Sequence, residues 1–417
     1  MQSHLPRSTD LLAGLHHLKV FVSVAHTGSI NRSADQIFKA PSAITRSVSE
    51  LERLLDKPLF ERKPRGMLIN PYGAAVLKRS LRIIDEVGQA ADESIFKTRS
   101  ESNVLSNLMM SGQKLQLLVS LHEQRNLTAA ALGLGMTQSG ASMSLKRIEG
   151  ALGRPLFQRM QQGLVTTDLG VRLLSRAKRI IAELRHMQSD LSAIAGTLAG
   201  HVTIGALPLG RTLLLPDGIA TAVKRHPNLR ISTLESPYEA LVHGLRNGDI
   251  DFILGALRSD GHGEGLIVES LFTDRMGILA RAGHRLAANR RILLSDLLAE
   301  QWILPRPDAP GRRLIDASFS ELGLMPPQPS VETGDLAILR RLLNNSDMLT
   351  AISPHQLTFE IESGMLVELP VVLGTSTRDI GLTLRRGALL SPAAYAVIEA
   401  VRESVGTLPQ YHDRHQN

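Results

Sequence analysis

The stretch from Ser29 to Arg62 reads SINRSADQIFKAPSAITRSVSELERLLDKPLFER, and the chain repeats its pattern 97 positions later. The second stretch, from Asn126 to Arg159, reads NLTAAALGLGMTQSGASMSLKRIEGALGRPLFQR and aligns with the first without a gap. Each copy predicts a helix, a tight turn, a second helix and then a short hairpin. Because two distant segments share one pattern, we expect the fold of the N-terminal half to be built twice.

Copy one shows how each copy is expected to fold. Ser29 is placed to cap a helix over residues 30–38, and residues 39–41 form the turn, because Pro41 suits a first helical turn. The second helix then begins at about Ser42. Its polar and basic face fits the major groove of DNA, and the basic hairpin that follows would reach phosphate as a wing. The apolar residues on its other face recur at steps of three and four and are expected to be buried: Ile44, Val48, Leu51 and Leu55.

Both copies resemble the winged helix-turn-helix of LysR-type transcriptional regulators. The resemblance rests on the first helix with Ser29 and Ala34, on the Leu51-Glu52 or Ile148-Glu149 pair that ends the recognition helix, and on the PLFxR motif that follows. Periodicity, turn, motif and spacing agree in both copies. The resemblance therefore implies two DNA-binding modules in one chain.

The resemblance and the polar faces together predict the residues that contact DNA. Two positions depart from the family: Pro41 stands where it usually has Gln, and Met143 stands where it often has Arg or His. One copy could therefore serve packing or dimerisation instead of DNA binding. The predicted contacts are Ser29, Arg32, Ser42, Thr45, Arg46, Ser49, Arg62, Lys63 and Arg65 in copy one, and Gln138, Ser139, Ser142, Lys146 and Arg159 in copy two.

The formal net charge of +7 is unevenly distributed along the 417 residues. Residues 1–100 hold 15 basic and 10 acidic side chains, and residues 101–198 hold 11 and 6, whereas residues 199–417 hold 21 and 24. The two repeated modules therefore carry +5 each and the remainder carries −3. This asymmetry favours a polyanion as the partner of the N-terminal half.

The composition narrows the function classes. A hydrophobic content of 43% and a charged content of 21% are typical of globular proteins, and the length suits about three domains. The absence of cysteine excludes disulfides, thiolate metal sites and thiol redox sensing. No run predicts a membrane span or a signal peptide, so we expect a cytoplasmic protein without membrane contact. The scattered histidines predict no metal site, and no motif predicts a cofactor or a catalytic centre.

The segments around the two copies predict long helices with different apolar stripes. Residues 1–13 resemble a mobile arm, Asn70-Pro71 starts a helix that runs to about Lys97, and the Ser- and Asn-rich segment 98–110 resembles a linker. Thr167-Asp168 opens a second long helix with a coiled-coil stripe. We therefore expect this second helix to hold two chains together, unless its stripe packs on its own chain. Its stripe comprises Leu173, Ala177, Ile180, Leu184, Met187, Leu191, Ile194 and Leu198, and the weaker stripe of the first helix comprises Val76, Ser80, Ile83, Val87, Ala90 and Ser94.

From Gly200 the pattern changes to strands that alternate with helices, which predicts a parallel sheet covered by helices. Strands are expected at 201–207, 228–235 and 250–255, and helices at 211–226 and 238–247. Strands at 276–281 and 301–304 would form a second lobe, and 380–385 would return to the first. The two lobes resemble the type 2 periplasmic-binding-protein fold.

The predicted fold class is therefore multidomain. Two all-α-type winged helix-turn-helix modules with long linker helices are followed by a two-lobe α/β domain that resembles a type 2 periplasmic-binding protein. The expected boundaries are 14–98 for the first module with its linker helix, 111–198 for the second module with its coiled-coil helix, and 199–405 for the effector-binding domain.

Ligands of a two-lobe fold bind in the cleft at the carboxyl ends of the strands, where helix N-termini present free N–H groups. Three segments satisfy this condition: the loop 207–212, the segment 305–308 and the segment 332–335. Arg306 could hold a carboxylate or bridge sugar hydroxyls, or it could form an ordinary salt bridge. The predicted effector-binding residues are Pro208, Leu209, Gly210, Arg211, Thr212, Arg306 and Thr333.

The leading hypothesis is a ligand-responsive transcriptional regulator that binds double-stranded DNA as a homodimer or homotetramer. The segments ALPLGRTLLLP and ILPRP resemble the family branch that includes a galactose-binding-protein regulator, which implies a sugar or a small organic acid as effector. The alternative is a cytoplasmic small-molecule sensor in which one or both modules serve dimerisation. The charge asymmetry and the intact PLFxR motifs favour the regulator.

Overall fold

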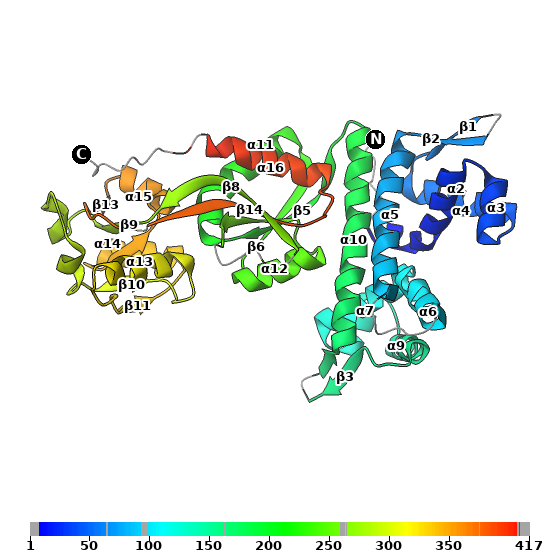
Figure 1. The fold of residues 1–417 in the computed structure, drawn as a ribbon, viewed down its shortest axis with the longest axis horizontal. Coiled ribbons are helices and arrows are strands. Elements are labelled where there is room, and N and C mark those ends of the chain that lie inside the picture. Colours follow the sequence, from blue (N-terminus) through cyan, green and yellow to red (C-terminus); the bar gives the residue numbers. More distant parts are fainter. Residues whose placement is uncertain are drawn as a thin grey trace.

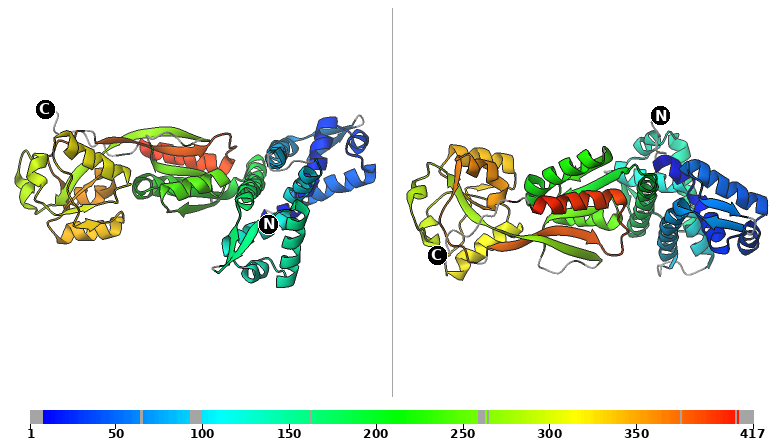
Figure 2. Two further views of the ribbon diagram at one scale, coloured as in Figure 1. Left: turned by 60° about the horizontal axis from the view of Figure 1, so that its bottom comes forward. Right: turned by 90° about the horizontal axis from the view of Figure 1, so that it is seen from above.

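In the computed structural model of the chain, residues 8–63, 66–92, 99–161, 163–258, 263, 265–374, 376–406 and 408 are described. The two helical modules lie at one end of an elongated molecule and the two-lobed α/β domain lies at the other (Figure 1). Figure 2 shows the same separation from two further directions. None of the helices within the described ranges is both long and apolar enough to cross a membrane.

The two modules contain the same α-helices and strands in the same order, and module one has a 3-10 turn in addition. Module one comprises α1 (Ser8–Ala13), the 3-10 turn η1 (Leu15–His17), α2 (Leu18–Thr27), α3 (Ile30–Ile37), α4 (Pro41–Leu55), β1 (Phe60–Lys63), β2 (Gly66–Ile69) and α5 (Pro71–Asp92). Module two comprises α6 (Arg99–Met109), α7 (Gly112–Gln124), α8 (Leu127–Gly133), α9 (Gln138–Leu152), β3 (Phe157–Met160), β4 (Gly163–Thr166) and α10 (Asp168–Ile194). The predicted helices, turns and hairpins of both copies are confirmed.

The helix boundaries follow from local capping. Ser29 caps α3, because its hydroxyl accepts a hydrogen bond from the backbone N–H of Arg32. Thr167 caps α10 in the same way, accepting from Gly170. The recognition helix α4 begins at Pro41, one residue earlier than expected, because proline needs no N–H partner in a first turn.

Two expectations outside the repeat are wrong. The segment predicted as a mobile arm forms α1 over residues 8–13, where Leu11 and Leu12 are buried; residues 1–7 lie outside the described residues. The segment predicted as a linker forms α6, where Leu108 and Met109 are buried. These two pairs are again 97 positions apart, so each module begins with one more helix than the motif shows. The end of the first long helix, predicted at Lys97, lies outside the described residues.

The apolar stripe of α10 is covered by α5 of the same chain, which corrects the expectation that it joins two chains. From Leu173 to Leu191 the stripe is at most 4% exposed, and the stripe of α5 from Val76 to Ala90 is at most 2% exposed. The two helices pack against each other along their lengths (Figure 1). The weaker stripe of α5, with its small Ser80 and Ala90, is therefore the surface on which the stronger stripe packs.

Lobe one is a five-stranded sheet with the order β6-β5-β7-β14-β8. Alternate residues of β7 enter different cores: Phe252 packs with α11 and α16, and Ile253 packs with α12. The elements are β5 (Ala199–Ala206), the π-helical turn η2 (Gly210–Leu214), α11 (Leu215–Arg225), β6 (Asn228–Leu234), α12 (Tyr238–Asn247), β7 (Phe252–Ala256), β8 (Leu266–Arg275), β14 (Thr377–Arg385) and α16 (Pro392–Val405). The single helix expected at 211–226 is thus divided into η2 and α11.

Lobe two is a second five-stranded sheet, with the order β11-β10-β12-β9-β13. Its elements are β9 (Gly277–Arg281), the 3-10 turns η3 (Arg285–Ala288) and η4 (Leu294–Leu297), β10 (Trp302–Leu304), α13 (Pro310–Glu321), β11 (Val331–Glu332), α14 (Leu336–Asn345), β12 (Leu349–Ile352), η5 (Pro354–Leu357), α15 (Thr358–Glu362) and β13 (Leu366–Glu368). β8 continues directly into β9, and β14 returns to lobe one as expected.

The two crossing strands are joined by a buried polar cluster. Asp274, at the end of β8, is fully buried and accepts hydrogen bonds from the hydroxyl of Ser353 at 2.6 Å and from Nε of Arg378 at 3.2 Å. Arg378 belongs to β14, and Nδ1 of His355 lies 3.1 Å from the same carboxylate. Because a buried carboxylate is stable only with such partners, this cluster fixes the junction between the lobes.

Candidate DNA interface and effector cleft

The recognition helices α4 and α9 are oriented by the same buried positions. In α4 the residues predicted to be buried are at most 4% exposed: Ile44, Val48, Leu51 and Leu55. In α9 the equivalent residues are at most 9% exposed: Ala141, Leu145, Ile148 and Leu152. The opposite face of each helix is left in solvent, as DNA binding in a groove requires.

A glutamate on each recognition helix holds the strand that leads into the wing. The carboxylate of Glu52 accepts a hydrogen bond from the backbone N–H of Leu59 at 2.7 Å. Glu149 accepts equivalent bonds from Leu156 at 2.7 Å and Phe157 at 3.1 Å. These bonds give a physical reason for the glutamate and the PLF motif that both copies share, because a charged acceptor makes a strong bond to a backbone N–H.

The wing is also tied to the loop before the first helix of each motif. The N–H of Met67 donates to the carbonyl of Gly28 at 3.0 Å, and the N–H of Leu164 donates to the carbonyl of Arg125 at 2.8 Å. At Gly66, with φ of 138°, a Cβ would lie 2.5 Å from the carbonyl oxygen of Gly28. A residue with a side chain does not fit this contact, so glycine is needed where the wing approaches the loop.

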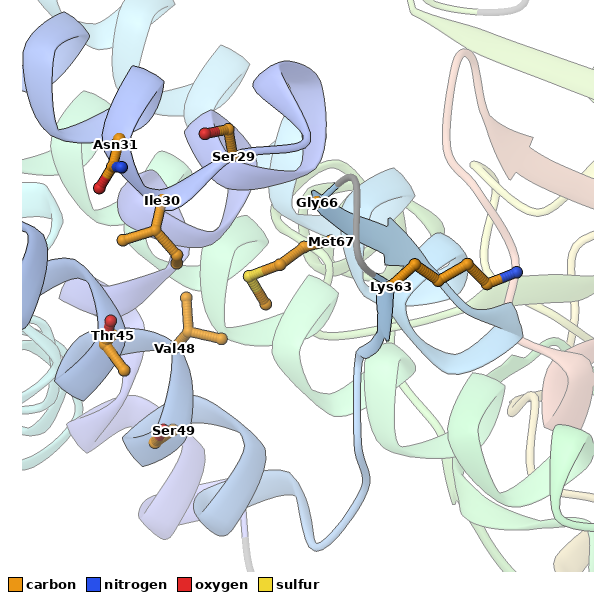
Figure 3. Close-up of a pocket in the computed structure, with 9 residues that line it drawn as sticks. All are labelled: Ser29, Ile30, Asn31, Thr45, Val48, Ser49, Lys63, Gly66 and Met67. Atoms are coloured by element: carbon orange, nitrogen blue, oxygen red, sulfur yellow. The ribbon is translucent and has the colours of Figure 1, made fainter.

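The wing of module one and its two helices enclose a groove of about 390 Å³. It is lined by Ser29, Ile30, Asn31, Thr45, Val48, Ser49, Lys63, Gly66 and Met67. Figure 3 shows Met67 pointing from the wing toward Val48, whereas Lys63 extends away from α4. The groove therefore has an apolar floor and a polar rim. Asn31 and Met67 are not among the predicted contacts, although Asn31 is near the capped start of α3 and Met67 follows the wing glycine.

Most of the predicted DNA-binding residues lie on exposed surfaces. Arg32, Ser42, Thr45, Arg46, Ser49 and Lys63 are exposed in module one, as are Gln138, Ser139, Lys146 and Arg159 in module two. Ser29 and Ser142 are half-buried, and the hydroxyl of Thr45 donates to the carbonyl of Pro41. The side chain of Arg62 and the whole of Arg65 lie outside the described residues.

Helix α10 also docks on lobe one through ion pairs. Lys178 Nζ lies 2.8 Å from Asp249 Oδ2, and the carboxylate of Asp251 contacts His186 Nε2 at 2.6 Å and Arg185 Nη2 at 3.2 Å. Burial by itself raises the pKa of Asp251, but the hydrogen bond with His186 and the charge of Arg185 outweigh it and lower that pKa. The carboxylate is therefore ionised at neutral pH and connects α10 to lobe one.

The two lobes enclose a cavity of about 420 Å³. Lobe one contributes Tyr238, Glu239, Val242, Arg246, Arg258, Gly263 and Leu266, and lobe two contributes Asp308 and Arg313. The guanidinium of Arg258 lies 4.6 Å from the centre of the Tyr238 ring, an arrangement typical of a cation–π contact. Nε of Arg258 is buried and has no hydrogen-bond partner among the described residues. Three arginines, Arg246, Arg258 and Arg313, therefore line the space between the lobes.

None of the residues predicted to bind the effector lines this cavity. Leu209 is 2% exposed and belongs to the core of lobe one, and Gly210 packs against the carbonyl of Leu254. Arg306 is exposed and forms no ion pair with a described residue. The ordinary salt bridge that was the alternative role for Arg306 is therefore not formed among the described residues. Pro208 is exposed, Arg211, Thr212 and Thr333 are half-buried, and the hydroxyl of Thr212 donates to the carbonyl of Pro208. Of the residues that line the cavity, Asp308 lies in the segment 305–308, which was predicted to face the cleft. The others were not predicted, because α12 and α13 are distant in sequence.

The described residues offer no place for a metal: no group of three His, Asp or Glu side chains among them is positioned to hold an ion. What they do present is two recognition helices with wings and a two-lobed domain with a cavity between its lobes. This combination defines a class of protein, the DNA-binding regulator with a ligand-binding domain.

Comparison with known proteins gives the family. The family model described as "LysR substrate binding domain" matches residues 195–406, and the model "Bacterial regulatory helix-turn-helix protein, lysR family" matches twice, at residues 15–74 and 113–171. The chain belongs to the LysR family of transcriptional regulators, which combine a DNA-binding helix-turn-helix with an effector-binding domain.

Relatives of two lengths match the chain. The HTH-type transcriptional regulator GalR of Pseudomonas putida is 40% identical over 401 residues, which cover 94% of this chain and 98% of the relative. The HTH-type transcriptional regulator GbpR of Azospirillum brasilense is 26% identical over 294 residues, which cover 70% of this chain and 86% of that protein. The first relative therefore matches nearly the whole chain and the second matches a shorter part of it.

Solved structures show the same fold. A full-length OxyR variant from Pseudomonas aeruginosa has a TM-score of 0.53 at 19% identity and covers 71% of this chain and 94% of its own. CbnR, a LysR family transcriptional regulator, has a TM-score of 0.51 at 18% identity and covers 70% of this chain and 98% of its own. In both comparisons the aligned part is a smaller share of this chain than of the solved structure. This difference is consistent with an additional segment in the present chain.

Proposed function

We propose that both winged modules contact duplex DNA and that a small organic acid, bound between the lobes, controls transcription. The observation that carries the DNA proposal is the solvent-exposed polar face of α4 and of α9, each beside a wing. The predicted contact residues are the groups that would bind the duplex. The charge of +5 on each module supplies the attraction to phosphate, and the sensor alternative does not explain why both modules carry it.

The DNA proposal is tested by removing one exposed cation from each recognition helix. Arg46→Ala and Lys146→Ala should each weaken binding of the full chain to fragments from upstream of its own coding sequence, by about 5- to 100-fold. The loss should shrink as salt rises, because each contact displaces counterions. Lys224→Ala, an exposed lysine on α11, is the matched control. Unchanged binding by Lys146→Ala would show that module two does not contact DNA.

The effector proposal rests on the charges that line the cavity between the lobes. Arg246, Arg258 and Arg313 face it together with the two acidic residues Glu239 and Asp308. The excess of guanidinium groups favours a carboxylate over a neutral sugar, because Arg pairs with carboxylates through two parallel hydrogen bonds. The Tyr238 ring adds an apolar surface for the body of the ligand. We therefore narrow the expected sugar or small organic acid to the acid.

Calorimetric titration of the full chain with a panel of small carboxylic acids and sugars tests the effector. Arg258→Ala should abolish the heat of binding, whereas Arg306→Ala, which removes an exposed guanidinium outside the cavity, should retain it. The opposite result would place the ligand at the carboxyl ends of the strands, where the sequence predicts it. Binding of a neutral sugar alone would refute the acid.

The remaining features of the proposal follow from the family. The chain would act on DNA in the cytoplasm, without a cofactor and without catalysis, as a homodimer or homotetramer. Because α5 and α10 cover each other within one chain, contacts between chains would involve other surfaces, such as those of the effector-binding domain.

A further inference from the structure

The helices α5 and α10 are joined by ion pairs that occur twice. Arg79 and Arg82 of α5 both bind Glu183 of α10: Arg79 Nη1 lies 2.8 Å from Oε2, and Arg82 Nε lies 2.6 Å from Oε1. The side chains of Arg79 and Glu183 are 1% and 4% exposed. This set therefore belongs to the interior of the interface.

The second set uses the equivalent residues of the other copy. Arg176 and Arg179 of α10 both bind Glu86 of α5: Arg176 Nη1 lies 2.9 Å from Oε2, and Arg179 Nε lies 2.8 Å from Oε1. A shift of 97 positions converts each member of the first set into one of the second, and the bonded atoms are the same.

Reciprocal contacts of this kind indicate a two-fold axis. In an isologous interface the same pair of contacts occurs twice: residue i of the first half contacts residue j of the second, and residue j of the first half contacts residue i of the second. This is the arrangement between the two subunits of a symmetric dimer. The helices are antiparallel, since Arg79 near the start of α5 also binds Asp190 near the end of α10, at 2.6 Å. The first helices obey the same axis, because α1 packs on α10 and α6 packs on α5. One chain therefore contains an internal pseudo-dimer of DNA-binding modules.

We propose that a single chain is a complete DNA-reading unit and that it recognises an asymmetric duplex site with two unlike half-sites, one for each module. This inference rests on the proposed contact of both modules with DNA. The apolar stripes of α5 and α10 are already covered within the chain, so the pair needs no second chain to complete it. Figure 1 shows module one near the start of α5 and module two near the start of α10, so the two readers lie at opposite ends of the pair.

The half-sites must differ because the two reading surfaces differ. Arg46 of α4 occupies the position of Met143 in α9, and Met143 is 54% exposed. Arginine donates two hydrogen bonds to guanine, whereas methionine has no donor and favours apolar contact such as that with the thymine methyl group. Lys63 of the first wing is likewise replaced by Met160, which is 60% exposed. A symmetric duplex cannot satisfy both modules equally.

The test is selection of duplexes from a random pool by the full-length protein. A random core of about 25 base pairs accommodates two half-sites one helical turn apart. We expect a selected sequence with two unlike halves at fixed spacing. Arg46→Met should lower the preference for guanine in one half only, by about 5- to 100-fold. Met143→Arg should create a guanine preference in the other half only, so that the two halves become more alike.

The outcomes separate this inference from the function on which it rests. A palindromic site in which Arg46→Met changes both halves equally would overturn the single-chain reader, because two chains would then be using the same module. If Met143→Arg and Lys146→Ala both leave selection unchanged, module two does not read DNA, and the proposed function fails together with the inference. Selection of no sequence at all would overturn both.

Discussion

Arg79 connects three parts of the molecule, and its replacement tests how they are held together. The guanidinium binds Glu183 and Asp190 of α10, and it also donates to the carbonyls of Leu389 at 2.7 Å and Leu390 at 3.1 Å, just before α16. Burial by itself lowers the pKa of Arg79, but the bonds to Asp190 and Glu183 outweigh it and raise that pKa above its usual value. Arg79→Met keeps most of the apolar stem but leaves these acceptors without their donor.

The structure predicts the magnitude from the exposure of the side chain. Arg79 is 1% exposed, and breaking a buried ion pair by removing one partner costs about 3–5 kcal/mol. The matched control is Arg82→Met: Arg82 is 28% exposed, and Glu183 keeps Arg79 as a partner. We expect the control to cost about 1 kcal/mol or less.

Urea denaturation with two probes measures this difference. Far-ultraviolet circular dichroism follows the helices of the whole chain, whereas the fluorescence of the single tryptophan, Trp302, follows lobe two, where it is fully buried. Arg79→Met should shift the helical transition to lower urea and leave the Trp302 transition nearly in place. If Arg79→Met is no more destabilising than Arg82→Met, the cluster does not hold the helices together.

Two further predictions concern the wing and the docking of α10. Gly66→Ala should destabilise the wing by about 1–3 kcal/mol, since its Cβ would meet the carbonyl of Gly28, whereas Gly133→Ala, with nothing within 4 Å, should stabilise α8 by about 0.5–1 kcal/mol. Thermal denaturation measures both changes, and equal effects would contradict the steric argument. Asp251 has a lowered pKa in the folded state, so its contribution to stability is present above its unfolded pKa of about 3.9 and is lost as the pH falls through the folded pKa. The difference in unfolding free energy between the parent and Asp251→Asn should therefore be largest at neutral pH and disappear in acid; a difference independent of pH would mean that the charge is not involved.

The sequence was sufficient for each module because its determinants are local. Caps such as Ser29 and Thr167 lie next to the helices they start, and apolar residues at steps of three and four define the buried face of α4 and α9. The alternation of strands and helices likewise predicted both lobes. These features depend on neighbours within a few residues, so the pattern is visible without the fold.

The sequence was insufficient where distant segments meet. Periodicity shows that the stripe of α10 is buried, but it does not show which helix covers it. The charged residues on the two helices indicate the partner, because Arg79, Arg82 and Glu86 recur with the same spacing at 176, 179 and 183. The cavity between the lobes gave no such signal, because its lining combines residues of α12 with residues in and near α13, two segments that are far apart in the sequence.

Pairing of the modules within one chain also constrains how an effector could act. A ligand that closes the lobes of two separate chains could change the angle between their DNA-binding arms. Here both modules are fixed to each other by α5 and α10, and α10 is fixed to lobe one through Asp249 and Asp251.

A ligand shifts an equilibrium only if it binds two arrangements of the protein with different affinities. Because the modules and lobe one are fixed to one another, the part that can change its position is lobe two. We therefore expect closure to move lobe two relative to a block made of lobe one and both winged modules. The spacing between the two recognition helices would stay constant. Regulation would then act through a partner of lobe two, such as a second chain, that contacts it differently in the two arrangements. The affinity of one chain for its own asymmetric site would be the same with and without the effector.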